Sequence, residues 1–242
     1  MMVAVDAPLA TGPHEENRNP SPLMTTVLHE FEQKLAGEFE RRTGLDYKAT
    51  IAEAIAVAEP EPGMKVLDVA TGSGIIARQL ISHVGEKGQI ICIDATPELV
   101  ERARLAAQSA GQGRRLEWQV APAEKLPFEA GKFDLITCTM AFPKLQAQQF
   151  LSEAHRVLKT GGRLLLATEL APKTSFGDFQ LKLRRNWFQF IARKPAEASA
   201  RFYSSEEISA LLNAAGFRQS IIRVLPPKSR HATIFSLIKA VK

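Results

Sequence analysis

One segment, residues 66–77, constrains the fold of this chain more than any other. An apolar run ends in the carboxylate Asp68, small residues and two glycines follow, and a helix-like apolar pattern then resumes. This order predicts a strand, a tight turn and the start of a helix, which is the layout of a nucleotide-binding βα unit. Gly72 and Gly74 would let a ligand approach the backbone closely because neither carries a Cβ atom.

A second carboxylate also points to a nucleotide-like ligand. The apolar run 89–93 lies about one βα unit further along the chain and ends in Asp94. A carboxylate at the end of the second strand is placed to accept hydrogen bonds from ribose hydroxyls. We therefore predict an adenosine-containing cofactor.

The charge near the turn separates two candidate cofactors. The spacing Gly72-x-Gly74-x-x-Ala77 also satisfies the dinucleotide pattern G-x-G-x-x-G/A, so an NAD-dependent oxidoreductase is one alternative. Asp68 argues against NAD, because an acid at the turn would repel a pyrophosphate. An acid there suits a ligand with positive charge, such as the sulfonium and ammonium of S-adenosylmethionine.

The chain contains five sequence motifs in a fixed order, and this order identifies a family more specifically than any single motif does. Through them the chain resembles the class I S-adenosylmethionine-dependent methyltransferases, most closely the ubiquinone/menaquinone-biosynthesis (UbiE-like) branch, over about residues 65–168. The motifs are Asp68-Val69-Ala70-Thr71-Gly72-Ser73-Gly74, Ile93-Asp94-Ala95-Thr96-Pro97, Ala123-Glu124-Lys125-Leu126-Pro127-Phe128, Phe133-Asp134-Leu135-Ile136-Thr137-Cys138-Thr139 and Arg156-Val157-Leu158-Lys159-Thr160-Gly161-Gly162-Arg163-Leu164.

The resemblance implies S-adenosyl-L-methionine as the cofactor and assigns its contacts to motif positions. The expected cofactor-binding residues are Asp68, Ala70, Thr71, Gly72, Ser73, Gly74, Asp94, Ala95, Ala123, Glu124 and Thr139.

The chain also departs from the family pattern. Pro122 stands where the family usually has Asp or Asn to reach the adenine amino group, and a proline offers no such hydrogen bond. The Y-D-x-M-N segment of the quinone-type members is missing. Their acid in strand five aligns with Thr168, whereas Glu169 falls one residue later. The sequence therefore does not predict a quinone acceptor.

Strand-like and helix-like patterns alternate from residue 65 onward, which predicts a parallel sheet covered by helices on both faces. A further helix is expected over 204–215, and the apolar runs 219–225 and 232–238 predict a terminal hairpin with an antiparallel last strand. The expected fold is a doubly wound, Rossmann-like α/β fold with a seven-stranded, mostly parallel sheet. The alternating segments are 65–70, 74–84, 89–94, 97–110, 115–120, 133–138, 147–158 and 162–168.

The N-terminal region divides into two parts. Residues 1–22 lack periodicity and are expected to form a disordered tail. Residues 23–59 are expected to form a helical cap, with Thr25 or Thr26 as N-cap of its first helix and Asp46 as N-cap of its second. The cap would cover the cofactor or the substrate mouth, or else simply pack on the sheet edge. Residues 60–242 then form the methyltransferase domain.

Residues 170–200 interrupt the repeating pattern with one aromatic stripe at helical spacing. We interpret this segment as a helical lid over an apolar substrate pocket. Plain core packing and a basic helix lying on a membrane are the alternatives. The expected substrate-contacting residues are Tyr47, Phe142, Phe179, Leu183 and Trp187.

The reaction expected from the resemblance is in-line methyl transfer to a small, apolar or aromatic acceptor. No general base can be assigned, because no histidine pair follows strand four. The [DN]-P-P-[FY] pattern is also missing, which argues against a nucleic-acid acceptor. A protein that binds the cofactor without transferring methyl, as a regulator or a natural-product cyclase, remains an alternative.

Composition agrees with one α/β enzyme domain. The 242 residues are 45% hydrophobic and 24% charged, which is ordinary for a globular protein. Two cysteines and no metal-spaced cluster predict no metal site. There is no apolar run long enough to span a bilayer and no signal peptide pattern, so a cytoplasmic location is expected. The sequence does not define the oligomeric state.

Overall fold

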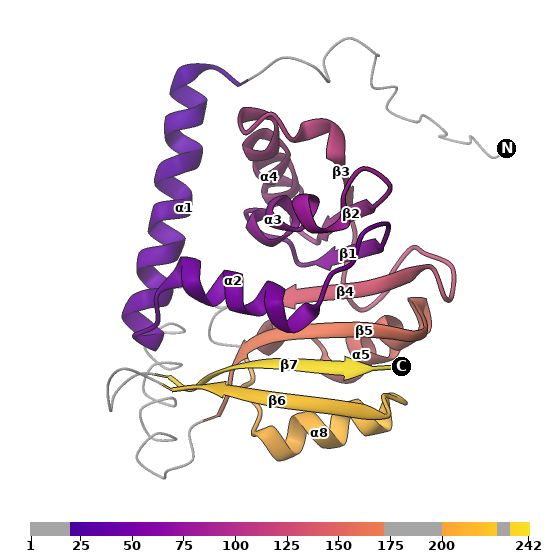
Figure 1. Ribbon diagram of the computed structural model, residues 1–242. Helices are drawn as coiled ribbons and strands as arrows, with labels where there is room; N and C mark the ends of the chain where they lie inside the picture. Colours follow the sequence, from indigo (N-terminus) through magenta and orange to yellow (C-terminus); the bar gives the residue numbers. More distant parts are fainter. Residues whose placement is uncertain (1–19, 172–199, 227–232) are drawn as a thin grey trace, which may run out of the picture.

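The computed structural model describes residues 20–171, 200–226 and 233–242. Its centre is a seven-stranded sheet with the order β3-β2-β1-β4-β5-β7-β6 (Figure 1). The strands are β1 (Lys65–Val69), β2 (Gln89–Asp94), β3 (Leu116–Val120), β4 (Phe133–Thr139), β5 (Leu158–Glu169), β6 (Gln219–Leu225) and β7 (Phe235–Val241).

The strand directions confirm the predicted fold class. Strands β1 to β5 are mutually parallel, and β7 lies between β5 and β6, antiparallel to both. The chain order reverses between β1 and β4, which is the switch point where open α/β sheets bind ligands. The last strand is displaced from the predicted run 232–238, because its pairing with β5 and β6 extends to Val241.

Helices cover both faces of the sheet, and each face has its own apolar core (Figure 1). Helices α2, α3 and α4 and the C-terminal part of α1 pack on one face, whereas α5 and α8 pack on the other. The helices are α1 (Pro22–Thr43), α2 (Tyr47–Ala58), α3 (Ile75–Val84), α4 (Pro97–Ser109), α5 (Ala147–Val157) and α8 (Ser205–Ala214), with short 3-10 helices η1 (Gly113–Arg115) and η2 (Phe142–Lys144).

The caps of the first two helices differ in how well the sequence predicts them. The prediction of Thr25 or Thr26 as the first N-cap was wrong, because the Ser21 side chain accepts the capping hydrogen bond and Pro22 begins α1. Both threonine hydroxyls instead donate to carbonyls one turn earlier. Asp46 caps α2 as predicted, with 2.7 Å from the Ala49 N–H to Oδ1.

Helix α1 stands beside the edge toward which the β4 arrow points (Figure 1). Glu32 on α1 forms an ion pair with Arg78 on α3. The Arg102 guanidinium of α4 lies 4.1 Å from the centre of the Phe31 ring of α1. These contacts hold α1 against the helices that follow β1 and β2.

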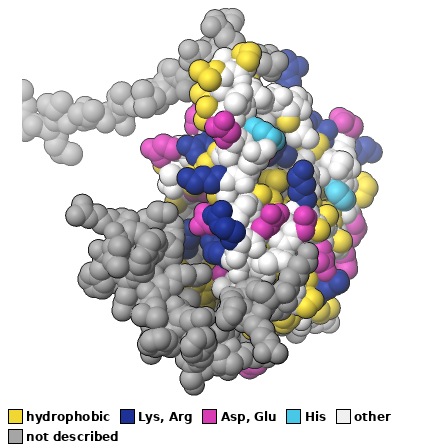
Figure 2. All heavy atoms as spheres, turned by 90° about the vertical axis from the view of Figure 1, so that its left-hand side faces the viewer, with side chains coloured by type: hydrophobic (Ala, Val, Ile, Leu, Met, Phe, Trp, Pro, Cys, Tyr) yellow, Lys and Arg dark blue, Asp and Glu magenta, His cyan; other side chains and the backbone are white. Residues whose placement is uncertain are grey.

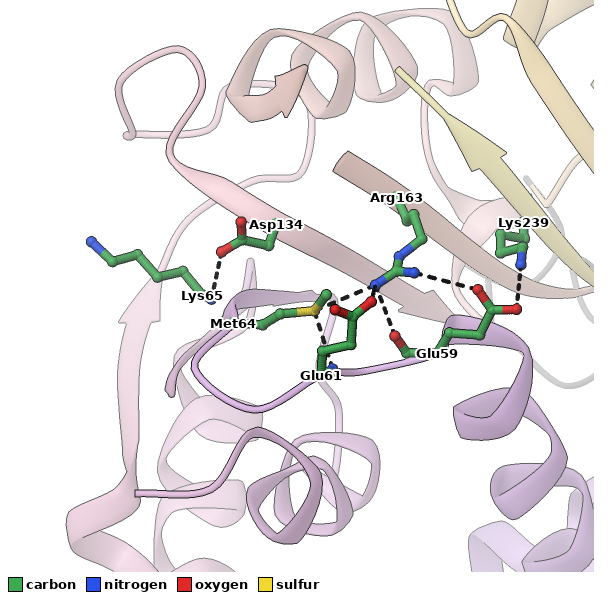
Figure 3. A network of polar contacts seen from close by, with 7 residues as sticks. All are labelled: Glu59, Glu61, Met64, Lys65, Asp134, Arg163 and Lys239. Carbon is green, nitrogen blue, oxygen red and sulfur yellow. Dashed lines mark hydrogen bonds and ion pairs between the residues drawn. The ribbon is translucent and has the colours of Figure 1, made fainter. Parts of the chain in front are cut away.

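A polar network ties the opposite edge of the sheet together (Figure 3). Arg163 on β5 contacts both Glu59 and Glu61, which lie in the connection from α2 to β1. The Nζ atom of Lys239 on β7 lies 2.7 Å from Glu59 Oε1. The network fixes where α2 ends relative to β5 and β7, and so helps to fix where α2 begins at the other edge.

On the side that α1 faces, the described surface shows no extended basic patch of the kind that binds a polyanion. Basic and acidic side chains are interspersed over its described part, without a continuous basic area (Figure 2). Within residues 20–171, 200–226 and 233–242, no helix combines the length and apolarity needed to cross a membrane. The predicted lid lies almost entirely outside the described residues.

Candidate functional site

The glycine turn sits at the carboxyl end of β1, beside the switch point. Its shape depends on three left-handed positions at alternate residues, Ala70 with φ 54°, Gly72 with φ 55° and Gly74 with φ 72°. A Cβ on Gly72 would lie 4.0 Å from its nearest neighbour, a backbone oxygen, so the backbone is open to a ligand there. A Cβ on Gly74 would instead lie 3.1 Å from the Trp118 ring. Gly72 therefore allows approach, whereas Gly74 is needed for packing.

Asp94 joins the turn to the end of β2. Its Oδ2 accepts the Gly72 N–H at 3.1 Å and its Oδ1 accepts the Thr96 N–H at 3.0 Å. Each carboxylate oxygen can accept a second hydrogen bond, so both remain able to bind a ligand hydroxyl. Asp94 is buried, whereas the next residue, Ala95, is exposed. The arrangement is compatible with the ribose-binding role predicted for Asp94.

Asp68 lies beneath the turn and carries the other carboxylate. The hydroxyls of Thr71 and of Thr137 on the neighbouring β4 each donate to it at 2.6 Å. Burial raises the pKa of this carboxyl to about 6; these two hydrogen bonds lower it, and the charge of Asp94 raises it further. Asp68 therefore fixes the turn to β4. It also contributes negative charge close to the glycine turn, where the cofactor is predicted to bind.

The remaining predicted cofactor residues line the same edge. Thr139, at the end of β4, is partly buried and Ala123 is buried. Glu124 accepts the Gln146 N–H at 2.9 Å and so links its loop to the start of α5. Pro122 is exposed. The loop is thus in place beside the turn, while direct contacts of these side chains with a cofactor stay a prediction.

Tyr47 connects the helical cap to the glycine turn. It is the first residue of α2, and the Ser73 side chain of the turn is close enough to its hydroxyl to lower its pKa. Burial and the nearby Glu32 outweigh this effect and that of Arg78, and raise the pKa of Tyr47 to about 12. The hydroxyl therefore keeps its proton at neutral pH. Tyr47 lies where both the cofactor turn and the α1–α2 cap can be reached.

Comparisons with known proteins agree with this geometry. A family described as a methyltransferase domain matches residues 66–162. The ubiquinone/menaquinone biosynthesis C-methyltransferase UbiE of Xylella fastidiosa is 32% identical over an alignment of 177 residues, which covers 68% of this chain and 70% of that protein. The chain belongs to the class I S-adenosylmethionine-dependent methyltransferases, near the UbiE branch.

Other comparisons show how far the likeness extends. The UbiE protein of Geobacter sp. strain M21 is 37% identical over 103 residues, so this chain spans only 44% of that relative's length. The solved structure of the YcgJ protein of Bacillus subtilis superimposes with a TM-score of 0.65 at 24% identity, covering 81% of this chain and 99% of that one. The methyltransferase fold thus extends beyond the region of strong sequence likeness.

The residues around the glycine turn of this methyltransferase fit S-adenosylmethionine, the cofactor of the family. Gly72 leaves the backbone open, Asp94 has free acceptor capacity, and Asp68 adds a second carboxylate below the turn. A dinucleotide would place its pyrophosphate against two carboxylates, and one N–H of the turn already donates to Asp94. The residues present therefore fit a cationic adenosine cofactor better than NAD.

The predicted acceptor residues have different surroundings. Phe142 is fully buried in η2, with its ring centre 6.2 Å from Phe150 and 5.5 Å from Tyr203. Phe179, Leu183 and Trp187 lie outside the described residues. Of the five, Tyr47 at the start of α2 and Phe142 just after β4 are described at the edge where the cofactor turn lies. Among the described residues, no group of three or more potential ligands could hold a metal ion.

Sequence reasoning missed two polar partners at this edge. Thr137 was recognised only as part of a strand, yet its hydroxyl donates to Asp68. The two residues meet because they are direct partners in the pairing of β1 with β4. Arg42, in the last turn of α1, forms an ion pair with Glu169 at the end of β5, with 2.8 Å between Nη2 and Oε1. No local pattern in the sequence links residues so far apart.

Proposed function

We propose that this chain transfers a methyl group from S-adenosylmethionine to a small, apolar or aromatic acceptor by in-line displacement. The observation that carries the proposal is the Asp94 carboxylate, which is fixed at the switch point by the N–H groups of Gly72 and Thr96. When bound, the cofactor supplies a methyl group that its sulfonium already activates. The protein then needs mainly to align the acceptor and to exclude water.

The residues of the site divide this work. Asp94 and the Gly72 backbone hold the adenosine part, and Asp68 stabilises positive charge from below. Tyr47 covers the turn from α2, and its protonated hydroxyl serves as a hydrogen-bond donor or acceptor rather than as a base. The apolar contacts to the acceptor come from Phe142 and from the predicted lid residues Phe179, Leu183 and Trp187.

A small-molecule acceptor is favoured over a nucleic acid by the surface. The α1 side mixes acidic with basic side chains, whereas a polyanion-binding face would gather Lys and Arg. We therefore place the acceptor in a pocket at the carboxyl edge and not along the surface of the molecule.

The first experiment is calorimetric titration with S-adenosylmethionine, S-adenosylhomocysteine and NAD in parallel. We expect micromolar binding of the two sulfur compounds and none of NAD. Asp94→Ala should weaken both sulfur ligands at least about tenfold, since it removes a charged hydrogen-bond acceptor. Asp134→Ala is the matched control, because Asp134 is an aspartate of β4 that pairs with Lys159 and the Lys65 N–H, away from the glycine turn. Binding of NAD alone would overturn the proposal.

The second experiment tests the acceptor side by transfer of labelled methyl groups to a panel of small acceptors. Trp187→Ala is expected to change which acceptors are methylated and to leave the affinity for S-adenosylmethionine nearly unchanged. A loss of cofactor binding in Trp187→Ala as large as that in Asp94→Ala would contradict the assignment of 170–200 as a substrate lid. Micromolar cofactor binding without transfer to any acceptor would instead support the non-catalytic alternative.

A further inference from the structure

Glu169 carries a buried carboxylate oxygen that has no hydrogen-bond partner among the described residues. Its Oε1 lies 2.8 Å from Arg42 Nη2, whereas its Oε2 is buried and unpartnered. The side chain is only 9% exposed, so water does not replace the missing partner freely. A buried acceptor without a donor costs stability, so it calls for an explanation, and a ligand that supplies the donor is one.

The position of Glu169 in the sheet places this oxygen on the same face as the helical cap. Side chains alternate along β5, so Glu169 shares a face with Ala167 and not with Thr168. Ala167 belongs to the core under α2 and α3. Glu169 also pairs directly with Phe235 of β7. The carboxylate therefore lies at the carboxyl end of β5, two strands from the glycine turn.

A continuous line of side chains joins Glu169 to the cofactor turn. The Phe235 ring lies 5.1 Å from the Phe39 ring, and Phe39 lies 5.5 Å from the Tyr47 ring. The Tyr47 hydroxyl in turn lies near Ser73 of the turn. Packed aromatic rings thus extend from the strand partner of Glu169 to the turn where the cofactor is proposed to bind.

Arg42 holds that carboxylate in one orientation. Its main-chain oxygen accepts the Thr233 N–H at 2.9 Å, which ties the end of α1 to the start of β7. Its Nη2 atom lies 2.8 Å from Oε1 of Glu169, while its own Nε and Oε2 of Glu169 are both buried without a hydrogen-bond partner among the described residues. Arg42 also lies 3.7 Å from Glu38, whose side chain is 38% exposed. Arg42 is in this sense a positioning residue for Glu169.

We propose that Glu169 Oε2 determines acceptor specificity by accepting a hydrogen bond from an O–H or N–H group of the methyl acceptor. The acceptor class is therefore an apolar or aromatic body that carries a hydroxyl or amino group. This inference rests on the proposed methyl transfer. It adds a hydrogen-bond acceptor to a site whose other predicted acceptor contacts are mostly apolar. A compound whose hydroxyl is already blocked as a methyl ether lacks the donor, and leaves Oε2 unpaired when it binds.

The test uses two probes that differ only in the donor, 2-naphthol and 2-methoxynaphthalene. Each is titrated by calorimetry into the full chain saturated with S-adenosylhomocysteine. We expect 2-naphthol to bind at least about tenfold more tightly, because a hydrogen bond to a charged acceptor is among the stronger ones. In Glu169→Gln an amide NH2 takes the place of Oε2, so the preference should fall to less than about twofold.

Controls separate this inference from the proposed function. Glu38→Gln removes the other carboxylate near Arg42 and should leave the preference for 2-naphthol unchanged. A preference that persists in Glu169→Gln, equal affinities in the wild type, or no binding of either probe would overturn the role of Glu169. The wild-type comparison stands even if Glu169→Gln does not fold. Failure of S-adenosylhomocysteine itself to bind would instead refute the proposed function.

Discussion

Asp68 allows a pH prediction of known sign. Its pKa is about 6 in the folded protein, chiefly because burial disfavours the charged form, against about 3.9 in an unfolded chain. Between these values the native state binds more protons than the unfolded state, so the free energy of unfolding falls as pH rises from about 4 to about 6. A pKa that is higher by about 2 in the folded protein corresponds to a loss of about 3 kcal/mol without ligand.

Asp68→Asn removes this titration while keeping the size of the side chain. The amide can accept from one threonine hydroxyl and donate to the other, since a hydroxyl serves in both roles. In urea unfolding without ligand at pH 4.5, 6 and 7.5, the variant should gain stability relative to the wild type as pH rises. The gain should be about 2 kcal/mol between pH 4.5 and 7.5, since part of the total effect lies below pH 4.5.

The control has the opposite sign. The pKa of Asp134 is lowered, since hydrogen bonds from Lys159 and the Lys65 N–H outweigh the effect of burial. The ionised Asp134 therefore stabilises the folded protein above its unfolded pKa, and this stabilisation is lost as pH falls. Asp134→Asn should be less stable than the wild type at neutral pH, and the difference should shrink toward low pH. Parallel pH profiles for the wild type and Asp68→Asn would refute the argument that burial governs Asp68.

Three further substitutions test other contacts. Gly74→Ala should lower the free energy of unfolding by about 1 kcal/mol or more beyond the loss in Gly63→Ala, measured by thermal unfolding. Both glycines have positive φ, but only a Cβ on Gly74 would contact Trp118. Tyr47→Phe removes a hydroxyl that lies near Ser73 of the glycine turn, and should cost about 1 kcal/mol in urea unfolding. Asp46→Ala removes the cap of α2 and should cost about 1 kcal/mol in thermal unfolding.

Each of these predictions has an outcome that contradicts it. Equal losses in the two glycine variants would mean that backbone strain alone matters at Gly74. An unchanged free energy of unfolding in Tyr47→Phe would mean that water serves its hydroxyl equally well in the unfolded chain. Unchanged stability in Asp46→Ala would mean that tertiary contacts alone hold the start of α2.

The helix starts show when a local signal suffices. Asp46 directly precedes an apolar helical pattern and caps α2, so the prediction was correct. At α1, Ser21, Thr25 and Thr26 all have a capping hydroxyl. Pro22, which favours the first helical position, was the signal that separates them.

The strand ends depend on partners more than on local pattern. The prediction for β2 matches the observed bounds, since its apolar run and its pairing with β1 coincide. For β7 the apolar run predicts 232–238, yet the strand runs Phe235–Val241. Lys239 follows the predicted run, yet it lies within the strand because it pairs with Leu165 of β5 and Ile221 of β6. Its ammonium also reaches Glu59.

The sequence by itself determined the order of strands and helices, the glycine turn with Asp68 and Asp94, and the family to which the chain belongs. Those features are local, because periodicity, turn chemistry and motif spacing act over a few residues. Only the tertiary structure decided that Thr137 binds Asp68, that Tyr47 reaches the turn, and that Arg42 fixes Glu169. A displacement of one residue along β5 moves a carboxylate to the other face of the sheet, and what it meets there depends on how distant elements pack.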